Sequence, residues 1–157
     1  MISQRARYAF KALVALARAD ERGMQIKDIA EQESIPRKFL EQILLSLKAG
    51  GLIMSRRGRE GGYALLKPPE QIFLGPVLRM IDGPIAPLPC LSRTAYRKCD
   101  DCANEEQCVV RAGFADAYDA SLKVLEMTSI ADAVRKGSPA RKRPSPRPNL
   151  ARVKAPA

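Results

Sequence analysis

Histidine is missing from all 157 residues of this chain. Without it the chain cannot build a Ser-His-Asp or Cys-His nucleophile pair, or a zinc site that uses imidazole. No apolar run approaches the roughly 20 residues of a membrane-spanning helix, and the opening MISQRARYAF lacks the apolar centre of a secretion signal. These absences exclude much hydrolytic chemistry, speak against a membrane protein and place the chain in the cytoplasm.

Acidic residues are few compared with basic ones, 17 Asp and Glu against 27 Lys and Arg, which gives a net charge of +10. Residues 1–67 hold 13 basic and 7 acidic side chains, residues 68–136 hold 8 and 10, and residues 137–157 hold 6 and none. A single domain of this length with a basic head and a basic tail predicts a polyanionic partner.

The last 21 residues contain five prolines and almost no large apolar side chains. Such a segment cannot bury enough surface to offset the entropy of ordering, so we expect a disordered tail. Two roles stay open for it, a solvated extension or a nonspecific anchor for nucleic-acid phosphates.

Apolar residues recur at helical spacing in the first 50 residues. One stripe covers residues 3–19, a short one covers residues 26–34, and a third follows Pro36, which suits the first position of a helix. The third stripe, which ends near Gly50 and Gly51, consists of Phe39, Leu40, Ile43, Leu44 and Leu47. Two short helices joined by a turn predict a helix-turn-helix whose second helix enters the major groove of DNA.

The outward side chains of that second helix are Arg37, Lys38, Glu41 and Gln42. Arginine and glutamine can make two-point hydrogen bonds to guanine and adenine edges, and glutamate can accept from cytosine N4. We expect these residues to contact DNA, with an ordinary polar helix face as the alternative.

Residues 52–67 predict a β-hairpin with a tip that reads SRRGREGG. Glycines permit unusual backbone angles there. Arg57 and Arg59, together with Arg56, suit a wing that lies on phosphates or in a narrow minor groove.

These motifs resemble those of a known family. The stretches RYAFKALVALA, IAEQESIPRKFLEQIL and LKAGGLIMSRRGREGGYALLKPPEQIFLGPVLRMIDGP are similar to winged helix-turn-helix regulators of the Rrf2 family, the group of IscR, NsrR and RirA. The R-G-x-x-G-G-Y wing at residues 57–63, in register with F-L-E-Q at residues 39–42, is specific, and the resemblance covers residues 1–134. It implies a mainly α fold and a dimeric transcription regulator, usually a repressor, that binds a double-stranded DNA operator and is not an enzyme.

All four cysteines lie in one proline-rich and acidic stretch with the spacing C-x8-C-x2-C-x5-C; they are Cys90, Cys99, Cys102 and Cys108. A disulfide is disfavoured in a reduced cytoplasm. Four thiolates suit a structural zinc ion or an iron-sulfur cluster, and the spacing alone does not separate the two.

The resemblance favours the cluster, because several members of the family carry one on cysteines of this loop. Three cysteines are typical there, and Cys90, Cys102 and Cys108 match them. The histidine that follows the last cysteine by three residues in IscR-type regulators is Arg111 here, and residues 4–8 lack the aspartate of the NsrR type. Cys99 is therefore the expected fourth ligand, and 4Fe-4S is favoured over 2Fe-2S. The alternatives are a zinc or free-thiol redox switch and, less favoured, a cluster-bearing redox enzyme or electron carrier.

A long apolar stripe follows the cysteines and predicts a helix of about five turns over residues 108–126. Its members are Val110, Phe114, Ala117, Ser121 and Val124, with Tyr118, Leu122 and Leu125 beside them. The helix could pack on the winged domain; the resemblance implies that it pairs with its twin in a homodimer.

We therefore divide the chain into four parts. Residues 1–83 form the winged helix-turn-helix domain, residues 84–108 the cysteine-rich cluster-binding loop, residues 109–136 the dimerisation helix with a C-terminal turn, and residues 137–157 the basic Pro-rich disordered tail.

Overall fold

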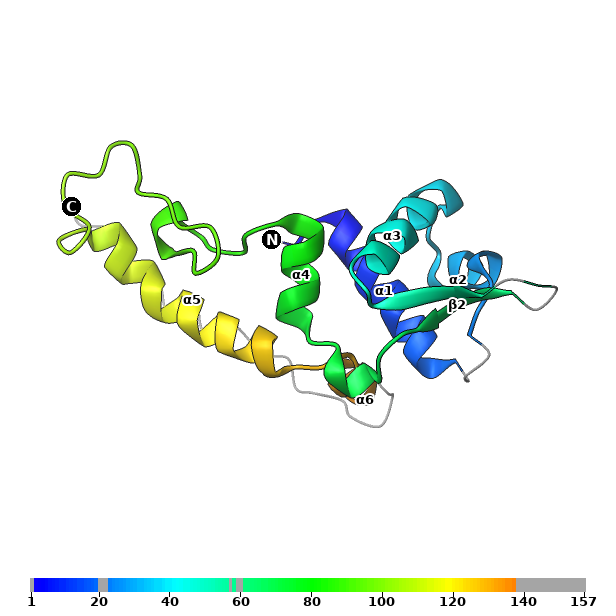
Figure 1. Cartoon of the computed structure of the whole chain (residues 1–157). Coiled ribbons are helices and arrows are strands. Elements are labelled where there is room, and N and C mark those ends of the chain that lie inside the picture. The colour runs from blue at the N-terminus through cyan, green and yellow to red at the C-terminus, as the bar shows by residue number, and fades with distance from the viewer. Residues whose placement is uncertain (1, 20–22, 57, 59–60, 138–157) are drawn as a thin grey trace, which may run out of the picture.

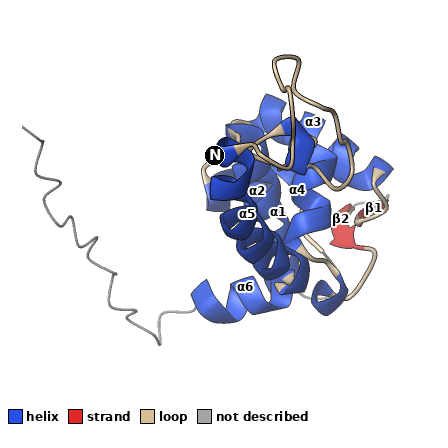
Figure 2. Cartoon of the chain, turned by 90° about the vertical axis from the view of Figure 1, so that its left-hand side faces the viewer, coloured by secondary structure: helices blue, strands red, loops and turns tan. Residues whose placement is uncertain are grey.

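The computed structural model describes residues 2–19, 23–56, 58 and 61–137. Arg57 and Arg59 of the predicted wing and residues 138–157 of the predicted tail lie outside this described part. The helices are α1 Gln4–Arg18, α2 Ile26–Glu33, α3 Arg37–Ala49, α4 Leu74–Asp82, α5 Val109–Met127 and α6 Ile130–Gly137 (Figure 1). The strands β1 Ile53–Arg56 and β2 Gly62–Leu65 form one antiparallel hairpin (Figure 2). This confirms the predicted fold class, mainly helical with a hairpin.

Helix α1 lies at the centre of the winged-helix body. The Ser3 hydroxyl caps the helix by accepting a 3.0 Å hydrogen bond from the Ala6 N–H. The buried face of α1 consists of Ala6, Ala9, Ala12, Leu13, Ala15 and Leu16. Since alanines leave room for close approach, α2, α3, α4 and α6 all pack against this one helix.

Helices α2 and α3 form the predicted helix-turn-helix. The turn depends on Ser34, which adopts the left-handed conformation (φ 52°, ψ 50°), and on Ile35, which is buried. Pro36 lies one position before the helix that it was expected to start. Helix α3 buries Leu40, Ile43, Leu44 and Leu47.

Phe39 does not belong to the core as the periodicity suggested, because 64% of its surface is exposed. Its side chain projects about 100° around α3 from that of Leu40, which is outside the buried stripe.

The hairpin is joined to the start of α2 by the backbone of Met24. The Met24 N–H donates to the Tyr63 carbonyl at 2.9 Å, and the Tyr63 N–H donates back to Met24 at 2.8 Å. Gly23 precedes this bridge with φ +81°, and a Cβ at that position would lie 2.3 Å from the Tyr63 carbonyl oxygen. Glycine is therefore needed here both for its backbone angle and for the close approach of the two segments.

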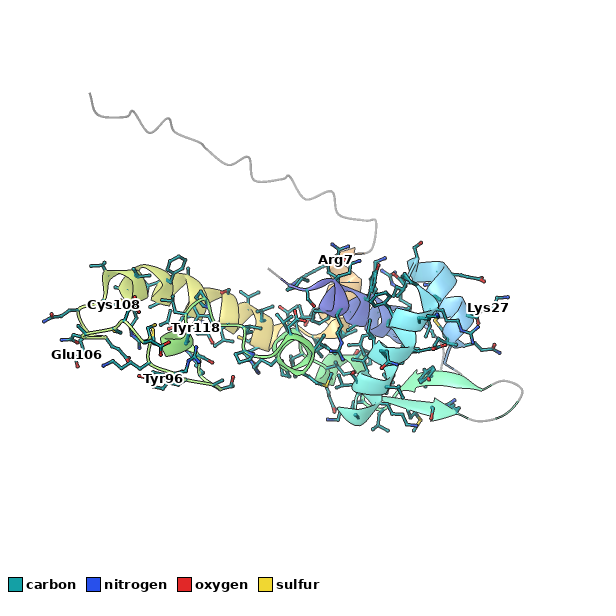
Figure 3. All side chains as sticks on the ribbon, turned by 90° about the horizontal axis from the view of Figure 1, so that it is seen from above. Arg7, Lys27, Tyr96, Glu106, Cys108 and Tyr118 are labelled. Carbon is teal, nitrogen blue, oxygen red and sulfur yellow. The ribbon has the colours of Figure 1, made fainter. Side chains whose placement is uncertain are left out.

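Helix α5 extends away from the winged-helix body and carries the cysteine loop at its far end (Figures 1 and 3). An ion pair between Arg79 and Glu126 joins α4 to the other end of α5. The expected C-terminal turn is an eight-residue helix, α6, which returns to α1 and buries Ile130 completely. No helix among the described residues has the length and apolarity to cross a lipid bilayer.

Candidate functional site

The four side chains of α3 that were predicted to contact DNA all lie on the exposed surface of that helix. They are Arg37, Lys38, Glu41 and Gln42. Arg37 and Glu41 lie about one helical turn apart and form an ion pair, with 3.3 Å between the Nε and Oε1 atoms. Both side chains are about half exposed or more, so the pair is weak and each partner stays available to a ligand.

Contacts from two other elements position α3. Arg5 Nη2 of α1 donates to Ser46 Oγ at 2.8 Å, and Ser46 Oγ donates to the Gln42 carbonyl oxygen at 3.0 Å. Lys48 Nζ donates to Ser55 Oγ of β1 at 2.8 Å, which links the helix to the hairpin. The contact between Arg5 and Ser46 could not be predicted from local spacing, because the two residues are 41 positions apart in the sequence.

The described part of the wing presents one arginine, at the end of β1. Arg56 is exposed and pairs with Gly62 at the end of the hairpin, and β1 packs against α3. Gly58 is exposed with φ +114°, a backbone angle that favours glycine. Because Arg57 and Arg59 lie outside the described residues, their contact with DNA stays a prediction.

The cysteine loop gathers the four thiols around one cavity of about 470 Å³. Cys90 lies in the 3-10 turn Pro89–Leu91 and is only 4% exposed. Cys108 directly precedes α5, where its sulfur accepts the Arg111 N–H at 3.4 Å. The Cys102 N–H donates to the Cys99 carbonyl at 3.2 Å. Figure 3 shows Tyr96, Glu106 and Cys108 at the end of the molecule remote from Lys27 of α2.

The thiols interact with one another. Burial raises the pKa of the Cys99 thiol, and a hydrogen bond with the Cys90 side chain raises it further. Burial and the neighbouring Cys108 raise the pKa of the Cys102 thiol. A metal that binds here must therefore displace protons, and the direction of these shifts is opposite to that of thiols activated for redox chemistry.

Arg111 closes one side of the cavity. Its guanidinium donates to the Cys90 carbonyl oxygen and lies 4.0 Å from Glu105 Oε2. Glu105 in turn accepts a hydrogen bond from the Tyr96 hydroxyl, and this contact raises the pKa of Tyr96. The position at which IscR-type regulators have a histidine thus joins the first cysteine turn to the start of α5.

Soft sulfur ligands suit zinc or an iron-sulfur cluster, and four of them line this cavity. Within the described ranges, however, no three Cys, Asp or Glu side chains are grouped closely enough to hold a metal ion. The donor set fits such a group in its chemistry, because four thiol side chains line one cavity.

Helix α5 presents two different faces. Tyr118 and Leu122 are buried against their own chain, whereas Val110, Phe114 and Val124 are each half exposed or more. A groove of about 680 Å³ runs beside this helix, lined by residues of α4, α5, the N-terminus and the loop that leads to the cysteines. The predicted apolar stripe therefore contains an inner side and an uncovered outer side.

Comparison with known proteins identifies the family. The Rrf2 family, described as iron-dependent transcriptional regulator, matches residues 2–136. An rrf2-like HTH-type transcriptional regulator of Rhodobacter capsulatus is 44% identical over 146 residues, which cover 90% of this chain and 97% of that protein. The HTH-type transcriptional regulator CymR of Bacillus subtilis is 30% identical over 132 residues, which cover 83% of this chain and 87% of that protein.

Solved structures agree in fold. CymR, described as the global cysteine regulator of B. subtilis, has a TM-score of 0.72 at 28% identity, over 87% of this chain and 97% of that chain. IscR of T. potens has a TM-score of 0.67 at 24% identity over 87% of each chain, which supports the shared fold alone. The relatives from R. capsulatus and B. subtilis are both transcriptional regulators and not enzymes. With a family match over nearly all of its described residues and the helix-turn-helix and hairpin in place, the chain belongs to the Rrf2 family of DNA-binding, winged-helix transcriptional regulators.

Proposed function

We propose that this regulator is a homodimeric repressor whose affinity for its operator is controlled by an iron-sulfur cluster that senses iron, redox or nitric oxide status. The ligands are Cys90, Cys99, Cys102 and Cys108. The observation that carries the proposal is that these four thiols line one cavity at the N-terminal end of α5. The description of the family as iron-dependent supports iron as the metal.

Within this proposal we take the cluster to be 4Fe-4S, which would bind one thiolate at each iron. Four thiolates also serve a 2Fe-2S cluster, so iron and sulfide content per chain distinguishes the two. When bound, such a cluster would supply a group that changes charge or is degraded when it reacts with an oxidant or nitric oxide. The protein contributes the buried Cys90 turn and the sulfur of Cys108, which already caps α5.

Helix α5 provides the connection between the cysteine loop and the DNA-binding body. Cys108 and Arg111 hold the loop to its first turns, and Glu126 near its other end pairs with Arg79 of α4. A rearrangement of the loop would therefore act on the N-terminal end of a helix whose C-terminal end is fixed to the body. This arrangement supports control of DNA affinity from a site remote from α3.

The uncovered side of α5 supports the dimer. Val110, Phe114 and Val124 expose apolar surface along a helix that projects from the body. A second copy would cover this stripe and present two α3 helices to an operator with two half-sites about one or more helical turns apart.

A zinc or free-thiol switch is the second candidate. It is favoured by the likeness to CymR, since the Staphylococcus aureus CymR structure at 27% identity and TM-score 0.64 is described as an oxidized form. All four cysteines here are free thiols, as such a switch requires in its reduced state.

Metal analysis of the full chain, purified without air, tests the proposal. We expect a visible absorption spectrum typical of iron-sulfur proteins. We also expect equal molar amounts of iron and acid-labile sulfide. Zinc without sulfide would overturn the cluster in favour of a zinc site. A colourless protein that also fails to rebind iron and sulfide anaerobically would overturn it in favour of a thiol switch.

A further inference from the structure

We propose that Phe39 is a further specificity-determining residue, whose ring contacts the C5-methyl group of a thymine in each half-site. This inference rests on the binding of DNA by α3. It adds apolar readout to a helix whose other exposed side chains at that end are polar or charged.

The exposure of Phe39 is the first observation. Its ring is 64% exposed, although the residue occupies the first turn of α3, directly before the fully buried Leu40. In a helix-turn-helix the N-terminal residues of the second helix meet the base edges. An aromatic ring left uncovered at that end is thus placed where the floor of the major groove would lie.

The neighbours of Phe39 define the strip to which it belongs. Gln42 follows it by three residues and Ser46 by seven, so the three side chains share one side of α3. The far end of the strip is held by Arg5, whose guanidinium is 2.8 Å from Ser46 Oγ. The strip therefore runs from an apolar ring, through an amide suited to adenine, to a cation suited to phosphate.

The other flank of α3 has a different character. The Arg37–Glu41 ion pair lies there, with its atoms 3.3 Å apart. Polar groups on that side can exchange their partner for a base or a phosphate, but none can recognise a methyl group. Phe39 is the one side chain in the first turns of α3 that offers apolar surface outward.

The chemistry of the groove selects thymine as the partner. Thymine alone among the four bases presents a methyl group in the major groove, and phenylalanine is a suitable apolar contact for it. Deoxyuridine pairs as thymidine does and lacks only this methyl group. Burial of one such carbon contributes about 0.8 kcal/mol, which corresponds to about fourfold in affinity.

The test uses duplexes that the full-length protein selects from a random DNA library. Each thymine of a selected duplex is replaced in turn by deoxyuridine, and affinity is measured at fixed salt. We expect one thymine in each half-site whose replacement weakens binding about fourfold. In Phe39→Ala the same replacement should have no effect, and in Phe39→Leu the penalty should be reduced.

Two matched variants serve as controls. Leu45→Ala removes another exposed apolar side chain of α3, six residues further along, and Gln42→Ala removes a polar neighbour on the same strip. Both should retain the deoxyuridine penalty, and thermal melts establish that every variant is folded.

Three results would overturn the inference: wild-type protein indifferent to deoxyuridine at every thymine, a full penalty in Phe39→Ala, or equal loss of the penalty in Leu45→Ala. Failure of the DNA-binding role itself would look different, because no sequence would then be enriched from the library.

Discussion

Four sulfur atoms carry the cofactor assignment, and each can be removed by a single substitution. Replacing Cys90, Cys102 or Cys108 with alanine removes a thiolate that no histidine in this chain can replace. We expect each variant, purified without air, to lose bound iron and sulfide, while the exposed loop variant Lys98→Ala retains them. Full iron content in all three cysteine variants would refute the assignment, and retention in Cys99→Ala alone would show that the fourth ligand is another group.

Hydrogen bonds between Ser129 and Asp132 stabilise the start of α6. The Ser129 hydroxyl and N–H both donate to Asp132 Oδ2, at 2.7 and 2.9 Å, and hold the pKa of that carboxyl at about 2, below its ordinary 3.8. A lowered pKa in the folded state means that the carboxylate stabilises the fold above about pH 4 and that this contribution is lost as the pH falls toward 2.

Ser129→Ala should therefore raise the pKa of Asp132 toward 3.8 and lower the free energy of unfolding at neutral pH by about 1 kcal/mol, the usual value of a helix cap. Carbon-detected NMR titration of Asp132 and denaturant unfolding at pH 7 and pH 2.5 check both effects. The stability difference between wild type and Asp132→Asn should shrink at the lower pH. An unchanged difference would mean that the carboxylate does not stabilise this helix.

At the scale of elements, the contact between the hairpin and the start of α2 depends on Gly23. A Cβ there meets the Tyr63 carbonyl oxygen at 2.3 Å and also has to adopt φ +81°. Gly51 shares a positive φ of +66° but has open space around it. We expect Gly23→Ala to lower the free energy of unfolding by roughly 2–3 kcal/mol and Gly51→Ala by about 1 kcal/mol. Equal losses in urea unfolding would contradict the close approach.

Periodicity predicted the elements well where one face of a helix is buried. It gave α1, α2, α3 and α5 to within a few residues, and the glycine-rich turn gave the hairpin. It misassigned Phe39, because a ring next to Leu40 fits an apolar stripe by spacing even when it projects outside it. It also missed that residues 130–137 are helical and return to α1, since this depends on the burial of Ile130 by distant residues.

In the candidate sites, too, the features set by local spacing could be predicted and the contacts between distant residues could not. Which side chains of α3 face outward could be predicted from local spacing, and so could the grouping of four cysteines. The hydrogen bond from Arg5 to Ser46 and the contact of Arg111 with Cys90 could not, because both depend on how separate elements pack.

For the whole molecule, the projecting α5 predicts a dimer that depends on its outer stripe. Phe114→Glu combined with Val124→Glu places two charges on surface that a second copy would bury. We expect this variant to sediment as a monomer, whereas Lys123→Glu, which changes an exposed charge on the same helix, stays dimeric. A dimer that survives the double substitution would show that the copies associate elsewhere.

Loss of the dimer should also weaken binding to a two-half-site operator far more than binding to a single half-site, because the two α3 helices would no longer be linked.

The most direct test of the account is the operator affinity of one protein sample measured before and after its cluster is removed by a chelator, with iron and sulfide assayed in both states. Couplings between two sites of a protein typically amount to about 5- to 150-fold in affinity. We predict a change within that range between the two states, and no change when a variant lacking Cys90 and Cys108 is treated in the same way. Equal affinity of the cluster-bound and cluster-free wild-type protein would contradict the claim that the cysteine loop controls DNA binding.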